Sequence, residues 1–66
     1  MASDFDYTGD ENHQAGFREK STGVQHWVPN IEGGPVELLD GDQVVITSSG
    51  QRVIWSISEQ RQVGYA

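Results

Sequence analysis

Hydrophobic and polar residues alternate most regularly between Arg52 and Ser58. Val53, Trp55 and Ile57 fall on one side of an extended chain, and mainly polar residues fall on the other. Because neighbouring side chains of a strand point to opposite faces of a sheet, this period of two predicts a strand with one buried face. We therefore expect Trp55 on the side of the core.

An earlier segment has a different pattern. Val44, Val45 and Ile46 follow one another without a polar residue, so a strand here is apolar on both faces. Such a strand is either central in a small barrel or covered on its second face by a partner. Both alternatives stay open at this point, and Val45 is a candidate contact with another protein.

Residues 24–66 have the composition of a β protein. They contain seven Val and four Ile but only two Leu and one Ala, and β-branched side chains suit the pleated surface of a strand. Gly41 after Asp40 and Gly50 after Ser49 are typical of turns. The expected strands cover residues 25–28, 36–38, 43–47, 52–58 and 62–65. The predicted fold is all-β, a small antiparallel sheet or partly open barrel of four to five short strands.

Residues 1–23 differ in composition from the rest of the chain. Apart from the first residue, their large apolar side chains are Phe5, Tyr7 and Phe17, and the others are polar or small. A segment of this kind buries too little apolar area to offset the entropy lost when its backbone is ordered. We therefore expect residues 1–23 to be a polar, largely flexible N-terminal arm, with a small β domain over 24–66. The three aromatic side chains are candidate contacts with a partner.

Charge and composition exclude several classes of protein. The chain has 66 residues, enough for one small domain, with 4 basic and 10 acidic residues and a formal net charge of −6. This charge disfavours direct binding of nucleic acid and a polybasic membrane anchor. The chain has no cysteine, which excludes disulfides, cysteine-ligated zinc and thiol catalysis. A stretch of about 18 apolar residues, as a membrane span requires, does not occur. The first residues lack the features of a classical signal peptide, so we expect a cytoplasmic or virion-associated protein.

Two acidic segments are candidate cation sites, and each is better explained otherwise. Asp4, Asp6 and Gly9 match the start of an EF-hand calcium loop, but Ala15 stands where the bidentate glutamate belongs. The sequence Asp40-Gly41-Asp42 is typical of a structural turn, in which the aspartate bonds to its own backbone. We therefore expect no metal site and no cofactor.

No catalytic arrangement is evident. His13 and His26 are thirteen positions apart and have no metal-binding spacing, and no serine lies in a nucleophile elbow. Trp27 follows His26 and stands two positions before Pro29, which would place it at the edge of a sheet. An exposed tryptophan there would be an interface anchor. We expect a protein without enzymatic activity.

Three functions remain. The first is a structural or interaction subunit that binds protein through a β edge or an apolar sheet face, and through its N-terminal arm. It would act by self-association or in a larger assembly, such as a phage capsid decoration or head–tail joining protein. A chain this short often gains stability by oligomerising. The second is an acidic inhibitor that occupies a nucleic-acid-binding protein. The third is a small SH3- or OB-like nucleic-acid module, which the four basic residues support least.

Overall fold

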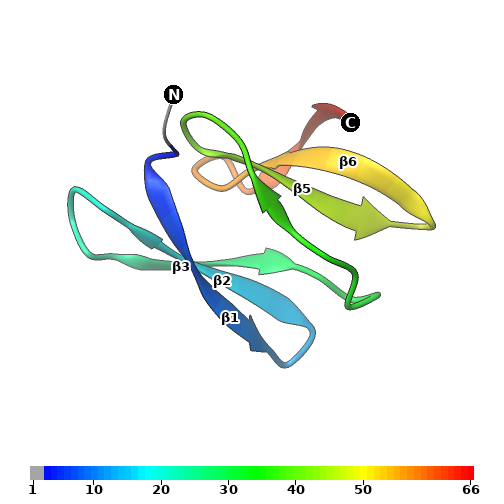
Figure 1. The fold of residues 1–66 in the computed structure, drawn as a ribbon, viewed down its shortest axis with the longest axis horizontal. Coiled ribbons are helices and arrows are strands. Elements are labelled where there is room, and N and C mark those ends of the chain that lie inside the picture. Colours follow the sequence, from blue (N-terminus) through cyan, green and yellow to red (C-terminus); the bar gives the residue numbers. More distant parts are fainter. Residues whose placement is uncertain (1–2) are drawn as a thin grey trace.

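The computed structural model describes residues 3–66, and this part of the chain is all-β, as the sequence predicts. The strands are β1 (Phe5–Glu11), β2 (Gln14–Glu19), β3 (Gln25–Pro29), β4 (Glu37–Leu38), β5 (Gln43–Ser48), β6 (Gln51–Ser56) and β7 (Arg61–Tyr65). They form two antiparallel sheets, ordered β1-β2-β3 and β4-β5-β6-β7 (Figure 1). The two sheets stay separate and do not close into a barrel. Of the seven strands within residues 3–66, five (β3–β7) lie in the part of the chain where the sequence predicted four to five, and β1 and β2 lie in the expected N-terminal arm.

One hydrophobic core lies between the two sheets. It consists of Phe5, Ala15, Phe17 and Val28 from the first sheet, and of Val44, Ile46, Val53 and Ile57 from the second sheet and the turn after β6. Alternate residues of a strand share a face, so Ala15 and Phe17 of β2 both point into the core. Each sheet thus buries one face against the other, which is the architecture of a small sandwich.

The strand predicted from alternation is present as β6. Val53 and Ile57 are buried in the core, and Trp55 is partly buried and packs against it, which confirms the predicted face. Ser56 is also buried, and its hydroxyl donates a hydrogen bond of 2.8 Å to Asp42 Oδ2. A buried hydroxyl needs a hydrogen-bond partner. This bond also connects the end of β6 to the turn before β5.

The run of apolar residues in β5 is buried on both faces. Val44 and Ile46 belong to the core, and Val45, on the opposite face, is only 4 % exposed. Val45 lies between Glu37 of β4 and Ile54 of β6 in the sheet. The chain itself therefore removes Val45 from water, without a closed barrel and without a second chain.

Two hairpins turn through a pair of residues with positive φ. Asn12 and His13 connect β1 to β2 with φ of 51° and 63°, and Ser49 and Gly50 connect β5 to β6 with φ of 52° and 76°. Two-residue loops of this conformation match the twist of antiparallel strands. The turn at Gly50 is the one that the sequence predicted. The turn at Asn12 was not predicted, since its second residue is not a glycine.

The structure differs from the expected N-terminal arm. Within residues 1–23, β1 and β2 form a hairpin, and Phe5 and Phe17 are buried in the core. The first two residues of the expected arm lie outside the described part of the chain. The low apolar content was misleading because a hairpin with one buried face needs few large side chains. Three inward-facing residues, Phe5, Ala15 and Phe17, are enough when a second sheet covers them.

The start of β1 is also attached to the second sheet. Ser3 forms a parallel bridge with Gly41, and the Asp4 amide donates a hydrogen bond of 2.8 Å to the Gly41 carbonyl oxygen. On the other side, the Lys20 amide donates to the Asp4 carbonyl oxygen at 2.9 Å. These bonds hold the beginning of the hairpin against the turn that precedes β5.

We expect Phe17→Ala to unfold the whole chain rather than loosen its N-terminal part. Removing a buried phenylalanine ring costs about 3–5 kcal/mol, which is comparable with the total stability of a small domain. Urea denaturation followed by far-UV circular dichroism measures the effect, and Tyr65→Ala, which removes a side chain that is 69 % exposed, is the control. If Phe17→Ala leaves the midpoint unchanged, the hairpin is not part of the cooperative fold.

Candidate functional site

The structure separates the five residues predicted to bind a partner. Phe5 and Phe17 fill the core and Val45 is buried beneath its neighbours, so none of these three presents its side chain to a partner in this conformation. Tyr7 is 45 % exposed and its ring lies 5.5 Å from that of Phe17, measured between centroids. Trp27 is partly buried. Tyr7 and Trp27 are the predicted contact residues that remain accessible.

Trp27 lies on the outer face of the first sheet. It pairs with Gly16 of β2, and a Cβ atom at Gly16 would lie 3.0 Å from the indole ring. Because Gly16 has no side chain, the indole of Trp27 can pack closely over this part of β2. Beside it, Gln25 Nε2 donates a hydrogen bond of 2.9 Å to Thr8 Oγ1. This polar pair and the indole cover the outer surface of a sheet whose inner surface is apolar.

A polar network joins β1 to the loop after β3. The hydroxyl of Tyr7 donates a hydrogen bond to Asp10, and Asn30 Nδ2 donates to the other carboxylate oxygen of Asp10 at 2.8 Å. Asn30 is 1 % exposed, and Nδ2 also lies 3.2 Å from the Gly34 carbonyl oxygen. The hydrogen bond to Asp10 is the main cause that raises the pKa of Tyr7 above 10.0, with burial and the negative charge of Asp10 adding to it.

The acidic turn and the histidines have structural roles. Gly41 takes a φ of 71°, as the turn interpretation requires, and Asp42 accepts the hydrogen bond from Ser56. His26 lies edge-on to Phe5, with 5.3 Å between ring centroids. Its Nε2 atom is 3.6 Å from a Glu19 carboxylate oxygen, which is too long for a hydrogen bond.

The outer edge of β7 is an exposed feature that could bind a ligand. β7 is the last strand of its sheet, and its residues Arg61–Val63 and Tyr65 are exposed. Val63 is 37 % exposed and Tyr65 is 69 % exposed. In the described pairing of β6 with β7, Val63 has no partner residue, because the register shifts there. An edge of this kind presents unpaired backbone groups that can accept another strand.

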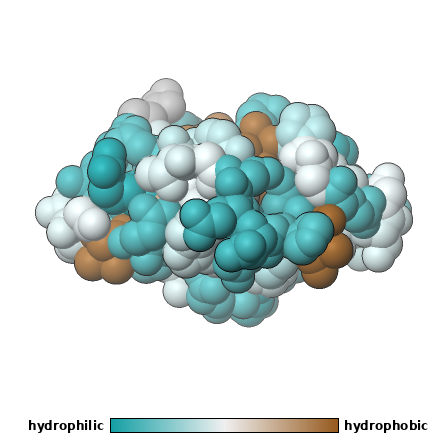
Figure 2. Space-filling model, turned by 90° about the horizontal axis from the view of Figure 1, so that it is seen from below, coloured by the Kyte–Doolittle hydropathy of each residue, from teal (hydrophilic) through white to brown (hydrophobic). Residues whose placement is uncertain are grey.

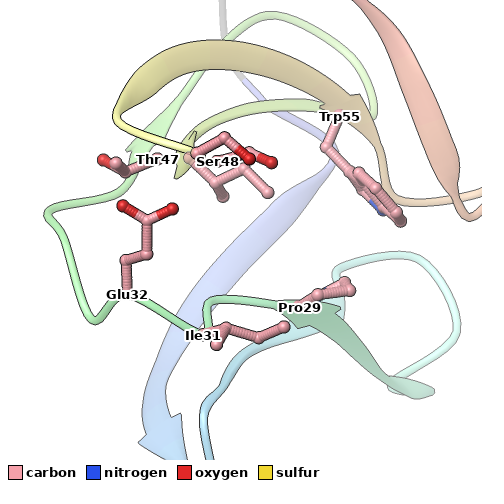
Figure 3. Close-up of a pocket in the computed structure, with 8 residues that line it drawn as sticks. Pro29, Ile31, Glu32, Thr47, Ser48 and Trp55 are labelled. Carbon is pink, nitrogen blue, oxygen red and sulfur yellow. The ribbon is translucent and has the colours of Figure 1, made fainter.

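The second feature is a cleft of about 280 Å³ between the two sheets (Figure 3). It lies between the loop after β3 and the β5–β6 hairpin. Its lining consists of Pro29, Ile31, Glu32, Ile46, Thr47, Ser48, Ser49 and Trp55. Figure 3 shows Trp55 reaching down from β6 towards Pro29, with Glu32 at the other end of the cleft. The walls are therefore apolar at one end and polar at the other.

The loop on the far side of the cleft is fastened to the β5–β6 hairpin. Both carboxylate oxygens of Glu32 lie within hydrogen-bond distance of the Gly50 amide, at 3.2 and 3.3 Å. Arg52 Nη1 donates a hydrogen bond of 3.0 Å to the Pro35 carbonyl oxygen. These contacts fix the width of the cleft. Trp55 Nε1 is buried and has no hydrogen-bond partner among residues 3–66, so the cleft wall contains an unpaired donor.

One face of the molecule is mainly polar. Figure 2 shows one face on which hydrophilic residues predominate and hydrophobic residues form small, separate patches. Within residues 3–66, no three His, Asp or Glu side chains are grouped closely enough to hold a metal ion. The described part of the chain also contains no helix long and apolar enough to span a membrane. An interaction at this surface would therefore use an edge or a cleft rather than a broad apolar face.

Sequence reasoning did not identify Ile31, Glu32 or Val63. Ile31 and Glu32 lie in a segment read only as a loop, and Val63 lies in the last expected strand without any sign of its exposure. For Val63, the useful signal was its position in the last strand, since a strand that lies at the end of a sheet has one unpaired side. The cleft had no such signal, because its walls come from distant parts of the chain.

The network at Asp10 predicts a measurable alkaline titration. The folded-state pKa of Tyr7 is raised, so the stability contributed by its hydrogen bond is present below pH 10 and is lost as the pH rises through the folded-state pKa. In a Tyr65→Phe background, Tyr7 is the remaining tyrosine and tyrosinate absorbance reports it alone. We expect Asp10→Asn to lower the midpoint of this titration. An unchanged midpoint would show that Asp10 does not hold the Tyr7 proton.

No protein-family model, no curated protein and no solved structure matches this chain. A function for this chain is therefore inferred from its own residues, above all from the exposed edge of β7 and the cleft beside Trp55.

Proposed function

We propose that this protein is a non-enzymatic structural subunit that associates with a second copy of itself through the edge of β7. The observation that carries the proposal is the exposed outer side of Arg61–Tyr65, a five-residue strand at the end of its sheet. Pairing two such edges would join two four-stranded sheets into one continuous sheet. A chain of 66 residues gains stability from such a contact, since its own core is small.

The sequence of β7 is complementary to itself. Two antiparallel copies centred on Val63 would place Val63 opposite Val63, Gln62 opposite Gly64, and Arg61 opposite Tyr65. No acidic residue lies in the strand and no like charges face each other. Arg61 would lie close to an aromatic ring, and a cation near an aromatic ring is attracted to it. Cross-strand pairs of these kinds are each stabilising.

The other strands at the ends of the sheets are less suitable. Two copies of β1 paired about Thr8 would place Asp6 opposite Asp10, and like charges directly opposite destabilise a strand pair. β4 contains only two residues, and β3 ends at Pro29, which has no backbone N–H to donate. Acidic residues on β1 and proline on β3 are features that protect an edge. β7 contains neither.

Binding of a partner through an apolar sheet face, which the sequence also predicted, has less support than pairing at the edge of β7. Val45, the residue proposed for that face, is buried by the chain itself. The acidic-inhibitor alternative is also weaker, because the acidic residues of β1 are partly engaged. Asp10 accepts hydrogen bonds from Tyr7 and Asn30, and Asp6 lies 3.9 Å from the Lys20 ammonium nitrogen.

The contact through β7 is expected to be weak. Five cross-strand pairs at roughly 0.2–1 kcal/mol each amount to about 1–5 kcal/mol, and the upper part of this range corresponds to a Kd of about 1 mM. Contacts of this strength become effective where many copies are held close together. A virion accessory subunit, such as a decoration or head–tail joining protein, would meet that condition.

We expect Val63→Lys to abolish self-association, because two lysines would face each other across the two-fold axis. Val63→Glu should also abolish self-association, because two glutamates would face each other. An equimolar mixture of the two variants should associate again, because a lysine would then face a glutamate. Sedimentation equilibrium up to about 1 mM protein, the concentration set by the expected affinity, measures each case. Val63→Thr, which keeps a β-branched side chain, is the matched control and should still associate.

Two results would contradict the proposal. Wild-type protein that remains monomeric over the whole concentration range has no such contact. Association of Val63→Lys as strong as that of the wild type would place the contact elsewhere. Val63 is 37 % exposed, so all three variants should remain folded, and circular dichroism checks this.

A further inference from the structure

We propose that the cleft beside Trp55 binds the side chain of a lysine or arginine from a partner protein. The cleft is built from two parts of the chain that the fold brings together, the loop at residues 30–36 and the β5–β6 hairpin. It is separate from the outer edge of β7. This inference therefore does not depend on the proposed self-association.

The charge of the cleft favours a cation. Of the described residues that line it, Glu32 is the one that carries a charge, and no lysine or arginine is among them. The whole chain has a formal net charge of −6, which adds to the attraction for a basic partner. A negatively charged ligand would be repelled by the same carboxylate.

Glu32 is also held in place to receive a cation. The Gly50 amide lies 3.2 Å and 3.3 Å from its two carboxylate oxygens, so the side chain is fastened at the end of the cleft rather than free in solvent. Each carboxylate oxygen has two lone pairs, and one amide N–H leaves most of them available. The hydroxyl groups of Thr47, Ser48 and Ser49 at the same cleft can accept further hydrogen bonds.

The opposite end of the cleft suits the hydrocarbon part of the same side chain. Pro29, Ile31 and Trp55 form apolar walls, and Ile31 is 75 % exposed. Lysine and arginine combine an aliphatic stem with a charged head, so an apolar wall next to a carboxylate matches both parts. An aromatic ring near a cation adds a further attraction.

The size of the cleft selects a small occupant. Its volume of about 280 Å³ is at the lower limit of sites for drug-sized ligands, which span roughly 300–1,000 Å³. One long side chain suits this space better than a nucleotide or another large cofactor.

The test uses three capped amino acids as probes, namely N-acetyl-arginine, N-acetyl-lysine and N-acetyl-norleucine methylamides. Norleucine has the aliphatic stem without the charge. In a Trp27→Phe background the fluorescence comes from Trp55, the one tryptophan left in the sequence, so it reports the cleft directly. We expect the arginine and lysine probes to change this fluorescence in a saturable way, and the norleucine probe to bind at least several-fold more weakly.

Glu32→Gln removes the charge and keeps an oxygen that can accept the Gly50 hydrogen bond. We expect it to weaken binding of the arginine probe by about tenfold, the effect of losing one charge-assisted hydrogen bond. Glu11→Gln makes the same change of charge on an exposed residue of β1 that does not line the cleft and should have little effect. Equal effects of the two variants would reduce the role of Glu32 to its contribution to net charge and would overturn the proposal.

A second measurement covers the case in which Trp27→Phe is poorly folded. In wild-type protein, the backbone amide resonances of Thr47 and Ser48 and the indole N–H resonance of Trp55 should shift when the arginine probe is added. Dilute protein, below the concentration at which β7 edges would pair, keeps this result independent of self-association. Saturable shifts confined to other residues, equal binding of the norleucine probe, or no binding of any probe would contradict the proposal.

Discussion

The fold depends on the burial of one face of the β1–β2 hairpin against β5 and β6. Phe5 and Phe17 come from the first sheet, and Val44 and Val53 from the second, and all four are buried in the same core. Neither sheet has another apolar layer to pack on, so each depends on the other for its stability. A three-stranded sheet with this composition would not be stable alone, because the ordering of its backbone would not be offset.

Polar contacts at the periphery set how the two sheets are aligned. Asn30 connects β1 with the loop after β3, and Glu32 connects that loop with the β5–β6 hairpin. At the other end, the Asp4 amide bonds to Gly41. Hydrogen bonds of this kind add little net stability, but leaving their buried partners unsatisfied is costly. They therefore select one arrangement of the sheets, and the cleft beside Trp55 follows from that arrangement.

Two small sheets that do not close leave strands with one unpaired side. β1 carries acidic residues and β3 ends in proline, features that protect a sheet edge, whereas β7 contains neither an acidic residue nor a proline. The proposed contacts at β7 and at the cleft use different parts of the molecule, the first through backbone pairing and the second through the charge of Glu32. A subunit with both could associate with its own kind and still hold a basic segment of another protein.

The sequence by itself determined the all-β class, the buried face of β6 and the turn at Gly50, because strand period and turn chemistry are local properties of the chain. It did not reveal that residues 5–19 form a hairpin, since Phe5 and Phe17 become buried only when a second sheet covers them. The same holds for Val45, whose apolar environment comes from its neighbours in the sheet rather than from a partner. Glu32 and Trp55 are 23 positions apart in the chain. Only the tertiary structure brings them to one cleft, because the packing of the two sheets, and not any local pattern, sets the distance between the loop and the hairpin.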